Sequence, residues 1–120
     1  MNIGPGIIIG GGISITPPPP PPSNKAIFGY GRTNVNLSMT NLVSNTGVVA
    51  NDTTGVGTAR YMLAAAGYGV DKAIFGYGRD NNGIYYSITN LVSNTGVVST
   101  DTTGVGTARY SLAAASYGFS

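Results

Sequence analysis

The side chains of this chain that could carry out chemistry are few. The acids are four aspartates and the bases are four arginines and two lysines, with no Glu, His or Cys: Asp52, Asp71, Asp80 and Asp101; Arg32, Arg60, Arg79 and Arg109; Lys25 and Lys72. General acid–base catalysis uses His or a carboxyl group of shifted pKa, and glycoside hydrolysis uses two facing carboxylates. The dispersed aspartates supply neither, so we expect no enzyme. Without His or Cys, we also expect no zinc or transition-metal site and no cofactor.

Most of these side chains occur in pairs because the chain contains a tandem repeat. Lys25–Arg32 is identical to Lys72–Arg79 at all 8 positions, and Thr40–Gly69 matches Thr89–Gly118 at 26 of 30 positions. The offset is 47 residues before a variable loop and 49 after it, which is the size of a propeller blade rather than of an ankyrin or tetratricopeptide unit. One such unit cannot bury its own apolar face, and two are too few to close a ring. We therefore expect the chain to need copies of itself.

The composition limits the partners. Charged residues make up 8% of the chain and the net charge is +2, whereas ordinary soluble domains carry about 25% charged residues. The basic residues are too dispersed for the clustered face that nucleic acid requires, so we expect no nucleic-acid partner. A surface with so little charge is typical of a protein that is assembled or covered by partners, because charge keeps monomers apart.

The sequence divides into four segments: residues 1–16, a Gly/Ile-rich peptide; 17–24, a polyproline linker; 25–71, repeat 1; and 72–120, repeat 2 with a C-terminal closing strand. The first segment is too short and too rich in Gly for a membrane span, and it lacks the basic start of a secretory signal. It is either a disordered leader or a peptide that anchors the chain on a partner. The anchoring residues would be Ile7, Ile8, Ile9, Ile13 and Ile15, and the prolines would form a spacer rod.

Each repeat predicts four short strands joined by tight turns, an all-β unit without helical periodicity. Ser-Asn-Thr-Gly marks a tight turn in each copy. The expected strands are Lys25–Gly31, Leu37–Leu42 and its copy Ile84–Leu91, a strand beginning at Val48, and Ala59–Gly67 with its copy within Ala108–Gly118.

The motifs resemble the kelch repeat. Thr58-Ala59-Arg60, Leu63–Gly67 and Lys72–Gly78 are similar to its Arg, small-residue strand, turn and glycine-closed strand. Gly-Tyr-Gly replaces the family's double glycine, and Val stands where the family usually has Trp. The resemblance implies two four-stranded propeller blades per chain, with the ring closed by oligomerisation.

Closure is expected between copies, because the strand order begins with a second strand and ends with a first one. The strand 109–118 of one chain would pair beside Lys25–Gly31 of the next. Head-to-tail contacts of this kind form rings when the rotation closes, and a trimer of six blades is favoured among dimer, trimer and tetramer. The residues expected at this closure are Lys25, Ile27, Phe28, Arg109, Leu112 and Ala114.

The repeat wording together with the Gly/Ile/Pro leader also resembles structural proteins of marine tailed bacteriophages. That resemblance implies a virion protein, a fibre, spike or capsid decoration subunit, on the particle surface, anchored to another virion protein and attaching to the host surface. The alternative is a free oligomeric lectin that binds cell-surface glycan. Removal of residues 1–22 separates the two, because a free lectin has no use for an apolar peptide on a proline rod.

Several residues have both a structural and a ligand-binding interpretation. Arg60 and Arg109 are expected to bind neighbouring loop carbonyls, and Asp52 and Asp101 to stabilise their own turns, with calcium or sugar binding as the alternative. The candidate surface contacts are two tyrosines between glycines and four residues of the variable loop: Tyr30, Tyr77, Asn81, Asn82, Tyr85 and Tyr86. The first two could instead pack between blades, and the other four could form an ordinary solvated loop.

Overall fold

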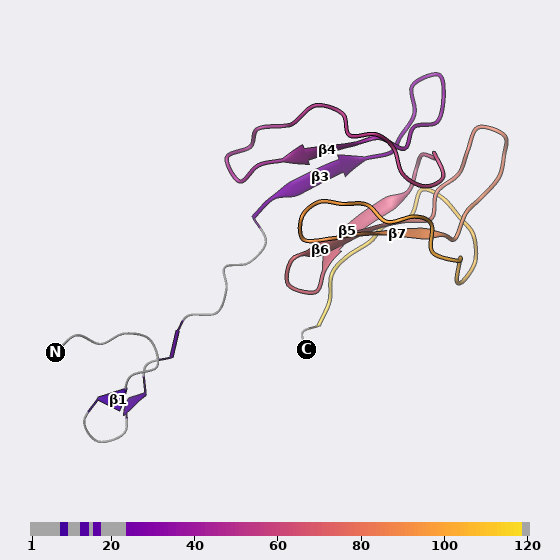
Figure 1. The fold of residues 1–120 in the computed structure, drawn as a ribbon. Helices are drawn as coiled ribbons and strands as arrows, with labels where there is room; N and C mark the ends of the chain where they lie inside the picture. Colours follow the sequence, from indigo (N-terminus) through magenta and orange to yellow (C-terminus); the bar gives the residue numbers. More distant parts are fainter. Residues whose placement is uncertain (1–7, 10–12, 15, 18–23, 119–120) are drawn as a thin grey trace.

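The structure is a computed structural model that describes residues 8–9, 13–14, 16–17 and 24–118. The described residues contain seven strands and no helix, which confirms the all-β prediction (Figure 1). The strands are β1 (Ile8–Ile9), β2 (Ile13–Ser14), β3 (Ala26–Gly29), β4 (Thr40–Val43), β5 (Ala64–Tyr68), β6 (Lys72–Gly76) and β7 (Thr89–Val92). The described residues therefore include no helix that could cross a membrane.

The two repeats form two antiparallel sheets. β3 pairs with β4, and β6 lies between β5 and β7. Isolated bridges from Val92 to Val98 and from Thr89 to Thr102 add a fourth chain segment beside β7, and repeat 1 has matching bridges beside β4. The β5–β6–β7 sheet thus has four segments, whereas the β3–β4 sheet has three, and no described residue pairs with the outer edge of β3.

Several strands are shorter than predicted because the backbone leaves the extended conformation. We expected strands over Lys25–Gly31 and Ala59–Gly67, but β3 ends at Gly29 and β5 begins at Ala64. Tyr30 and Met62 have φ angles of 64° and 55°, and a residue in this left-handed region breaks a strand. The predicted strands over Leu37–Leu42 and Ile84–Leu91 are likewise confined to their C-terminal parts, β4 and β7.

The segment 108–118 repeats the sequence of 59–69 but forms no strand in this chain. It runs alongside its own copy, where the Ser111 N–H donates to the Met62 carbonyl at 2.8 Å and the Ser116 hydroxyl donates to the Gly67 carbonyl. The predicted closing strand is therefore absent within the single chain. The physical reason is that β5 is held by pairing with β6, and 108–118 has no comparable strand beside it among the described residues.

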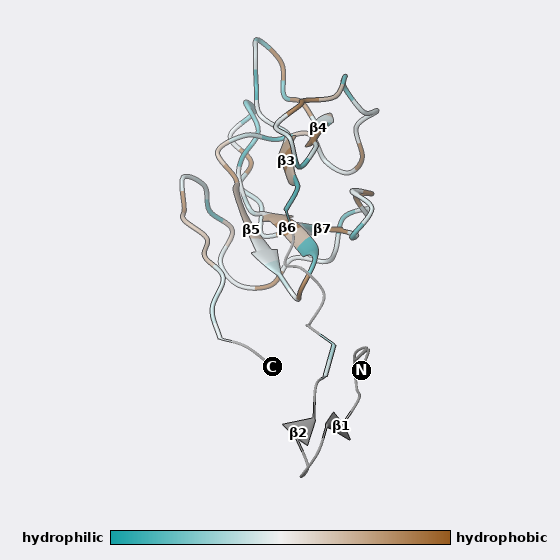
Figure 2. Cartoon of the chain, turned by 90° about the vertical axis from the view of Figure 1, so that its left-hand side faces the viewer, coloured by the Kyte–Doolittle hydropathy of each residue, from teal (hydrophilic) through white to brown (hydrophobic). Residues whose placement is uncertain are grey.

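A small core lies between the two sheets, which sit one beside the other (Figures 1 and 2). Its buried residues are Tyr30, Phe75, Val92 and Val98. The rings of Tyr30 and Phe75 are 5.2 Å apart and tilted. Gly29 makes this approach possible, because a Cβ there would lie 2.7 Å from the Phe75 ring. Hydrophobic residues also occur in the exposed loops (brown in Figure 2), so much apolar surface remains uncovered.

The N-terminal segment is described only in part. Ile8, Ile9 and Ile13 lie in β1 and β2, which pair antiparallel with Ile9 opposite Ile13. Ile7, Ile15 and residues 18–23 lie outside the described residues. The anchoring role and the polyproline rod therefore stay predictions.

Candidate functional site

Arg60 joins the two repeats and is fully buried. Its backbone belongs to repeat 1, since its carbonyl accepts from Gly31 N–H at 3.0 Å and its N–H donates to the Leu37 carbonyl at 3.3 Å. Its guanidinium binds repeat 2, where Nε donates to the Tyr77 carbonyl at 2.6 Å and Nη2 to Asn90 Oδ1 at 2.8 Å.

The guanidinium also packs on aromatic and loop groups of its own repeat. Its Nη1 donates to the Thr58 carbonyl at 2.9 Å, and its Cζ lies 4.8 Å from the centre of the Tyr30 ring. Burial lowers the pKa of Arg60, but an arginine stays charged in proteins. The expectation that Arg60 binds neighbouring carbonyls is confirmed.

Asp101 extends this polar network to the exposed surface. Its Oδ1 accepts from the Thr58 N–H at 3.1 Å and from Asn90 Nδ2 at 2.9 Å, and its Oδ2 accepts from the Thr58 hydroxyl at 2.6 Å. We expected Asp52 and Asp101 to stabilise their own turns, and this was wrong. Asp101 binds Thr58, which precedes it by 43 residues, and Asp52 accepts from Asn41 Nδ2 at 2.8 Å, because each loop folds back over its own sheet.

The ionisation of Asp101 should stabilise the fold. Burial raises the pKa of this carboxyl, but the hydrogen bonds from Thr58 and Asn90 outweigh burial and hold the pKa below its ordinary value. A lowered pKa means that the stabilisation is present above the unfolded pKa of about 3.9 and is lost as the pH falls through the folded value.

We therefore predict that Asp101→Asn lowers the free energy of unfolding at pH 7. The free energy of unfolding of the variant should also fall less than that of the wild type when the pH is lowered. Urea unfolding of the wild type and the variant at pH 7 and at about pH 3 measures both effects. The gap between the two proteins should narrow at the lower pH. A gap that stays constant would contradict a role for the charge.

Arg109 is the copy of Arg60, but it is exposed. Its backbone makes the matching bonds, since its carbonyl accepts from Gly78 N–H at 2.9 Å and its N–H donates to the Tyr86 carbonyl at 3.2 Å. Its guanidinium donates only to the Thr107 carbonyl among the described residues, at 2.9 Å, and lies 4.5 Å from the Tyr77 ring centre. Arg109 thus has the counterparts of the contacts that Arg60 makes within its own repeat, and within the described part of the chain it lacks counterparts of the contacts that Arg60 makes with the following repeat.

The other predicted closure residues lie on two separate faces. Lys25 and Phe28 are exposed and Ile27 is half-buried, all at the start of repeat 1. Leu112 is half-buried and Ala114 is exposed, both in the segment 108–118. A single chain brings neither set to the other.

The predicted surface contacts fall into different environments. Tyr30 is buried and packs between the sheets, as its structural interpretation expected, with its hydroxyl donating to the Val56 carbonyl at 2.8 Å. Tyr77 is only half-buried. Tyr85 is half-exposed, and its ring centre lies 5.0 Å from that of Tyr110 with the two planes tilted by 55°.

The variable loop 80–84 is held by Asp80, which is only 7% exposed. Its carboxylate accepts from the N–H groups of Asn82 and Ile84 and from the Tyr86 hydroxyl, at 2.9, 3.0 and 2.9 Å. The Ile84 bond, then those from Tyr86 and Asn82, lower the pKa of Asp80 despite burial. The exposed Asn81 side chain accepts from Asn36 Nδ2 at 3.0 Å, so the loop is ordered and touches repeat 1.

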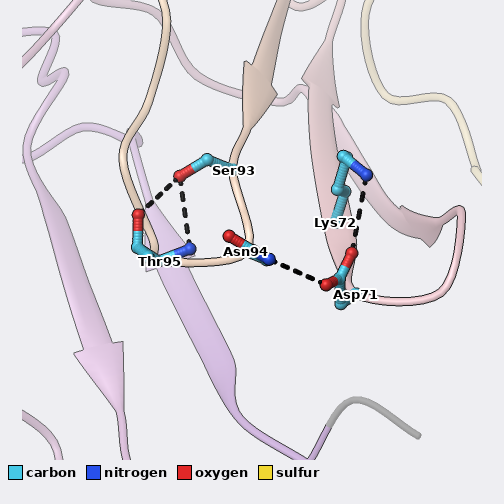
Figure 3. Close-up of polar contacts among 5 residues, drawn as sticks. All are labelled: Asp71, Lys72, Ser93, Asn94 and Thr95. Carbon is cyan, nitrogen blue, oxygen red and sulfur yellow. Dashed lines mark hydrogen bonds and ion pairs between the residues drawn. The ribbon is translucent and has the colours of Figure 1, made fainter. Parts of the chain in front are cut away.

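An open groove of about 850 Å³ lies between the two sheets, at the start of β3 and of β6. At its rim, Asn94 Nδ2 donates to Asp71 Oδ2 at 2.9 Å, and Lys72 Nζ lies 3.5 Å from Asp71 Oδ1 (Figure 3). The Asn94 bond, more than the Lys72 charge, lowers the pKa of the exposed Asp71. The described residues contain no group of three potential metal ligands.

Sequence reasoning missed Asn90, Thr58 and Asp80. Asn90 and Thr58 hold the Arg60–Asp101 network, and Asp80 holds the loop. Each network partner has the same residue type in its copy, so no sequence signal distinguishes the buried copy from the exposed one.

Comparison with protein-family models and with curated protein sequences finds no match to this chain.

Proposed function

We propose that the chain is a non-enzymatic structural subunit, which assembles with copies of itself into a closed β-propeller displayed on a virion by its N-terminal segment. Each repeat contributes one blade. The segment 108–118 of one chain supplies the first strand of the blade that repeat 1 of the next chain begins.

One observation carries the proposal. In repeat 2 the outer edge of β6 pairs with β5, the last strand of repeat 1, whereas β3, the copy of β6 in repeat 1, has no strand at that edge among the described residues. The segment 108–118, which copies β5 and its flanks, has no strand partner. An exposed strand edge favours pairing with another chain. When two copies meet, the segment 108–118 of one copy can therefore pair with the outer edge of β3 in the other.

We expect native mass spectrometry of the whole chain to find one closed oligomer, with three copies of the 12.2 kDa chain favoured. Closed rings have a fixed copy number, whereas open stacks give a ladder of masses. A folded monomer at all concentrations would contradict assembly, and a concentration-dependent ladder would contradict closure.

The virion role is supported by the resemblance of the repeats and leader to phage structural proteins and by the apolar leader ahead of six prolines. We expect deletion of Met1–Pro22 to leave the copy number of the oligomer unchanged while abolishing incorporation into particles. Incorporation of the truncated chain at the wild-type level would contradict anchoring by this segment.

A free glycan-binding lectin is the second candidate, because Tyr85 exposes half of its surface beside Asn81 and Asn82. Aromatic faces flanked by amide groups suit sugar rings, which stack and hydrogen-bond. A glycan array probed with the whole chain and with Tyr85→Ala tests it. Binding by the wild type that is lost in the variant would favour the lectin, and no binding would exclude it.

A further inference from the structure

The junction between the two repeats is a template for a second junction that the single chain does not make. Each repeat has a leading face, which in repeat 2 packs on repeat 1, and a trailing face, which in repeat 1 receives repeat 2. The leading face of repeat 1 and the trailing face of repeat 2 are uncovered. Residues that occupy the same position in the two repeats differ in their surroundings on these faces.

We propose that these two uncovered faces form one directional interface between copies of this chain, in which Arg109 of one copy binds Asn41 of the next. The inference rests on the proposed ring assembly and specifies its interface. It is argued from side chains that are identical in type but opposite in exposure.

The polar half of the interface is already arranged on repeat 1. Asn41 Nδ2 donates to the Ala50 carbonyl at 3.1 Å and to Asp52 Oδ1 at 2.8 Å. Asn90 makes the same two bonds, to the Ser99 carbonyl and to Asp101, at 3.1 and 2.9 Å.

The difference lies at the oxygen of each amide. Asn90 Oδ1 accepts from Arg60, whereas Asn41 Oδ1 accepts no hydrogen bond from the described residues. Arg109 is the exposed copy of Arg60, and Thr107, which would bind Asp52 as Thr58 binds Asp101, precedes it by two residues. Arg109 and Thr107 are therefore the donors that fit Asn41 and Asp52.

The apolar half of the interface contains an exposed phenylalanine ring. Phe75 is 4% exposed and fills the space above Gly29, whereas its copy Phe28 is 63% exposed. Gly76 is the copy of Gly29, and no aromatic ring lies within 4 Å of a Cβ built there. The inner junction therefore places Phe28 of the next copy over Gly76, which is already buried in the single chain and presents no open notch.

Two further apolar positions agree. A Cβ at Gly96 would meet the Leu42 side chain at 2.7 Å, whereas nothing lies within 4 Å of one at Gly47. Leu91, the copy of Leu42, is exposed on the uncovered trailing face. Polar, aromatic and aliphatic contacts thus all predict the same alignment of one copy against the next.

The strand register follows from the pairing of β5 with β6. Tyr68 lies opposite Lys72 and Ala64 opposite Gly76. The corresponding pairs between copies are Tyr117 with Lys25 and Ala113 with Gly29. Tyr110 would then lie opposite Arg32, as Tyr61 lies opposite Arg79.

Because the two faces differ, one substitution can disable either face and leave the other intact. Arg109→Glu disables the trailing face. Val49→Asp disables the leading face, since Val49 is 52% exposed while its copy Val98 is 9% exposed in the core. Val48→Asp is the matched control, because Val48 and its copy Val97 are 64% and 62% exposed, so the site stays open even at a completed junction.

We expect Arg109→Glu and Val49→Asp each to be folded and monomeric by circular dichroism and native mass spectrometry, with association weakened at least about 100-fold. Val48→Asp should assemble like the wild type. A mixture of the two monomeric variants should give a 1:1 heterodimer and nothing larger, since one intact leading face meets one intact trailing face. Heterodimer formation also proves that both variants are folded.

The outcomes separate the interface from the ring itself. If the wild type assembles and the two variants also assemble, this interface is overturned but the proposed function is not. The same holds if the wild type assembles and the mixture of variants gives no heterodimer. A wild type that stays monomeric overturns both. A loss of assembly in Val48→Asp equal to that in Val49→Asp overturns the predicted alignment of the faces.

Discussion

Replacing Arg60 by Ala should cost at least about 3 kcal/mol of unfolding free energy, a large share of the roughly 5–15 kcal/mol that holds a domain. The change removes three hydrogen bonds from a fully buried guanidinium. It leaves the Tyr77 carbonyl and Asn90 Oδ1 without their donor at the boundary of the repeats. Urea unfolding followed by circular dichroism measures the loss.

Arg60→Lys should recover little of this stability. The guanidinium reaches the Tyr77 carbonyl and Asn90 from two different nitrogens, and a single ammonium cannot reproduce that planar geometry. The ammonium also loses the stacking of the guanidinium plane near Tyr30. Full recovery by Lys would show that charge alone, and not geometry, is required.

Arg109→Ala is the control with the same local sequence. Because the contacts of Arg60 lie within one chain, the unfolding free energy that is lost in Arg60→Ala should not depend on protein concentration. The contacts proposed for Arg109 lie between chains, so its loss should be small in dilute solution and grow as the wild type assembles. Equal losses at low concentration would contradict the difference between the two environments.

The sequence predicted the kind of fold better than the extent of its elements. Apolar stretches separated by glycine-rich turns indicated the positions of β3 to β7, but the strands expected to begin at Val48 and to lie within 108–118 are not formed; Val49 and Val98 make only isolated bridges. The strand ends were missed because Tyr30, Met62 and Tyr77 adopt positive φ angles. Side chains of these types rarely take that conformation, so only the surrounding contacts, and not the local sequence, impose it.

The candidate site was predictable in part. The type and position of Arg60 indicated that it binds carbonyl groups, and it does. Its partners Asn90 and the Tyr77 carbonyl come from the other repeat, and no local pattern connects them with it. The repeat itself concealed the rest, because Phe28 and Phe75 have identical neighbours in sequence and yet differ in exposure from 63% to 4%.

Deleting Ala108–Ser120 should abolish assembly completely. The deletion removes the copy of β5 that has no strand partner among the described residues, and it removes Arg109 and Tyr110. The truncated chain should be monomeric by native mass spectrometry, with its β3 edge exposed and prone to aggregate at high concentration. A closed oligomer of the truncated chain would contradict strand exchange.

A synthetic peptide of residues 104–118 tests whether the deletion acts through strand pairing. Addition of a strand to an open sheet edge gains backbone hydrogen bonds and fits alternate side chains into pockets. The peptide should therefore bind the truncated chain one to one at β3, whereas a scrambled peptide should not. We expect Phe28→Asp to prevent assembly of the whole chain, but it should not prevent binding of the peptide. The reason is that in the proposed interface Phe28 would pack against the sheet of a neighbouring copy, which the peptide lacks, while the pairing of Ala113 with Gly29 would use the backbone alone. Strand pairing and face packing are thus separable contributions to one junction, and the junction inside the chain, where both are present, shows what their sum achieves.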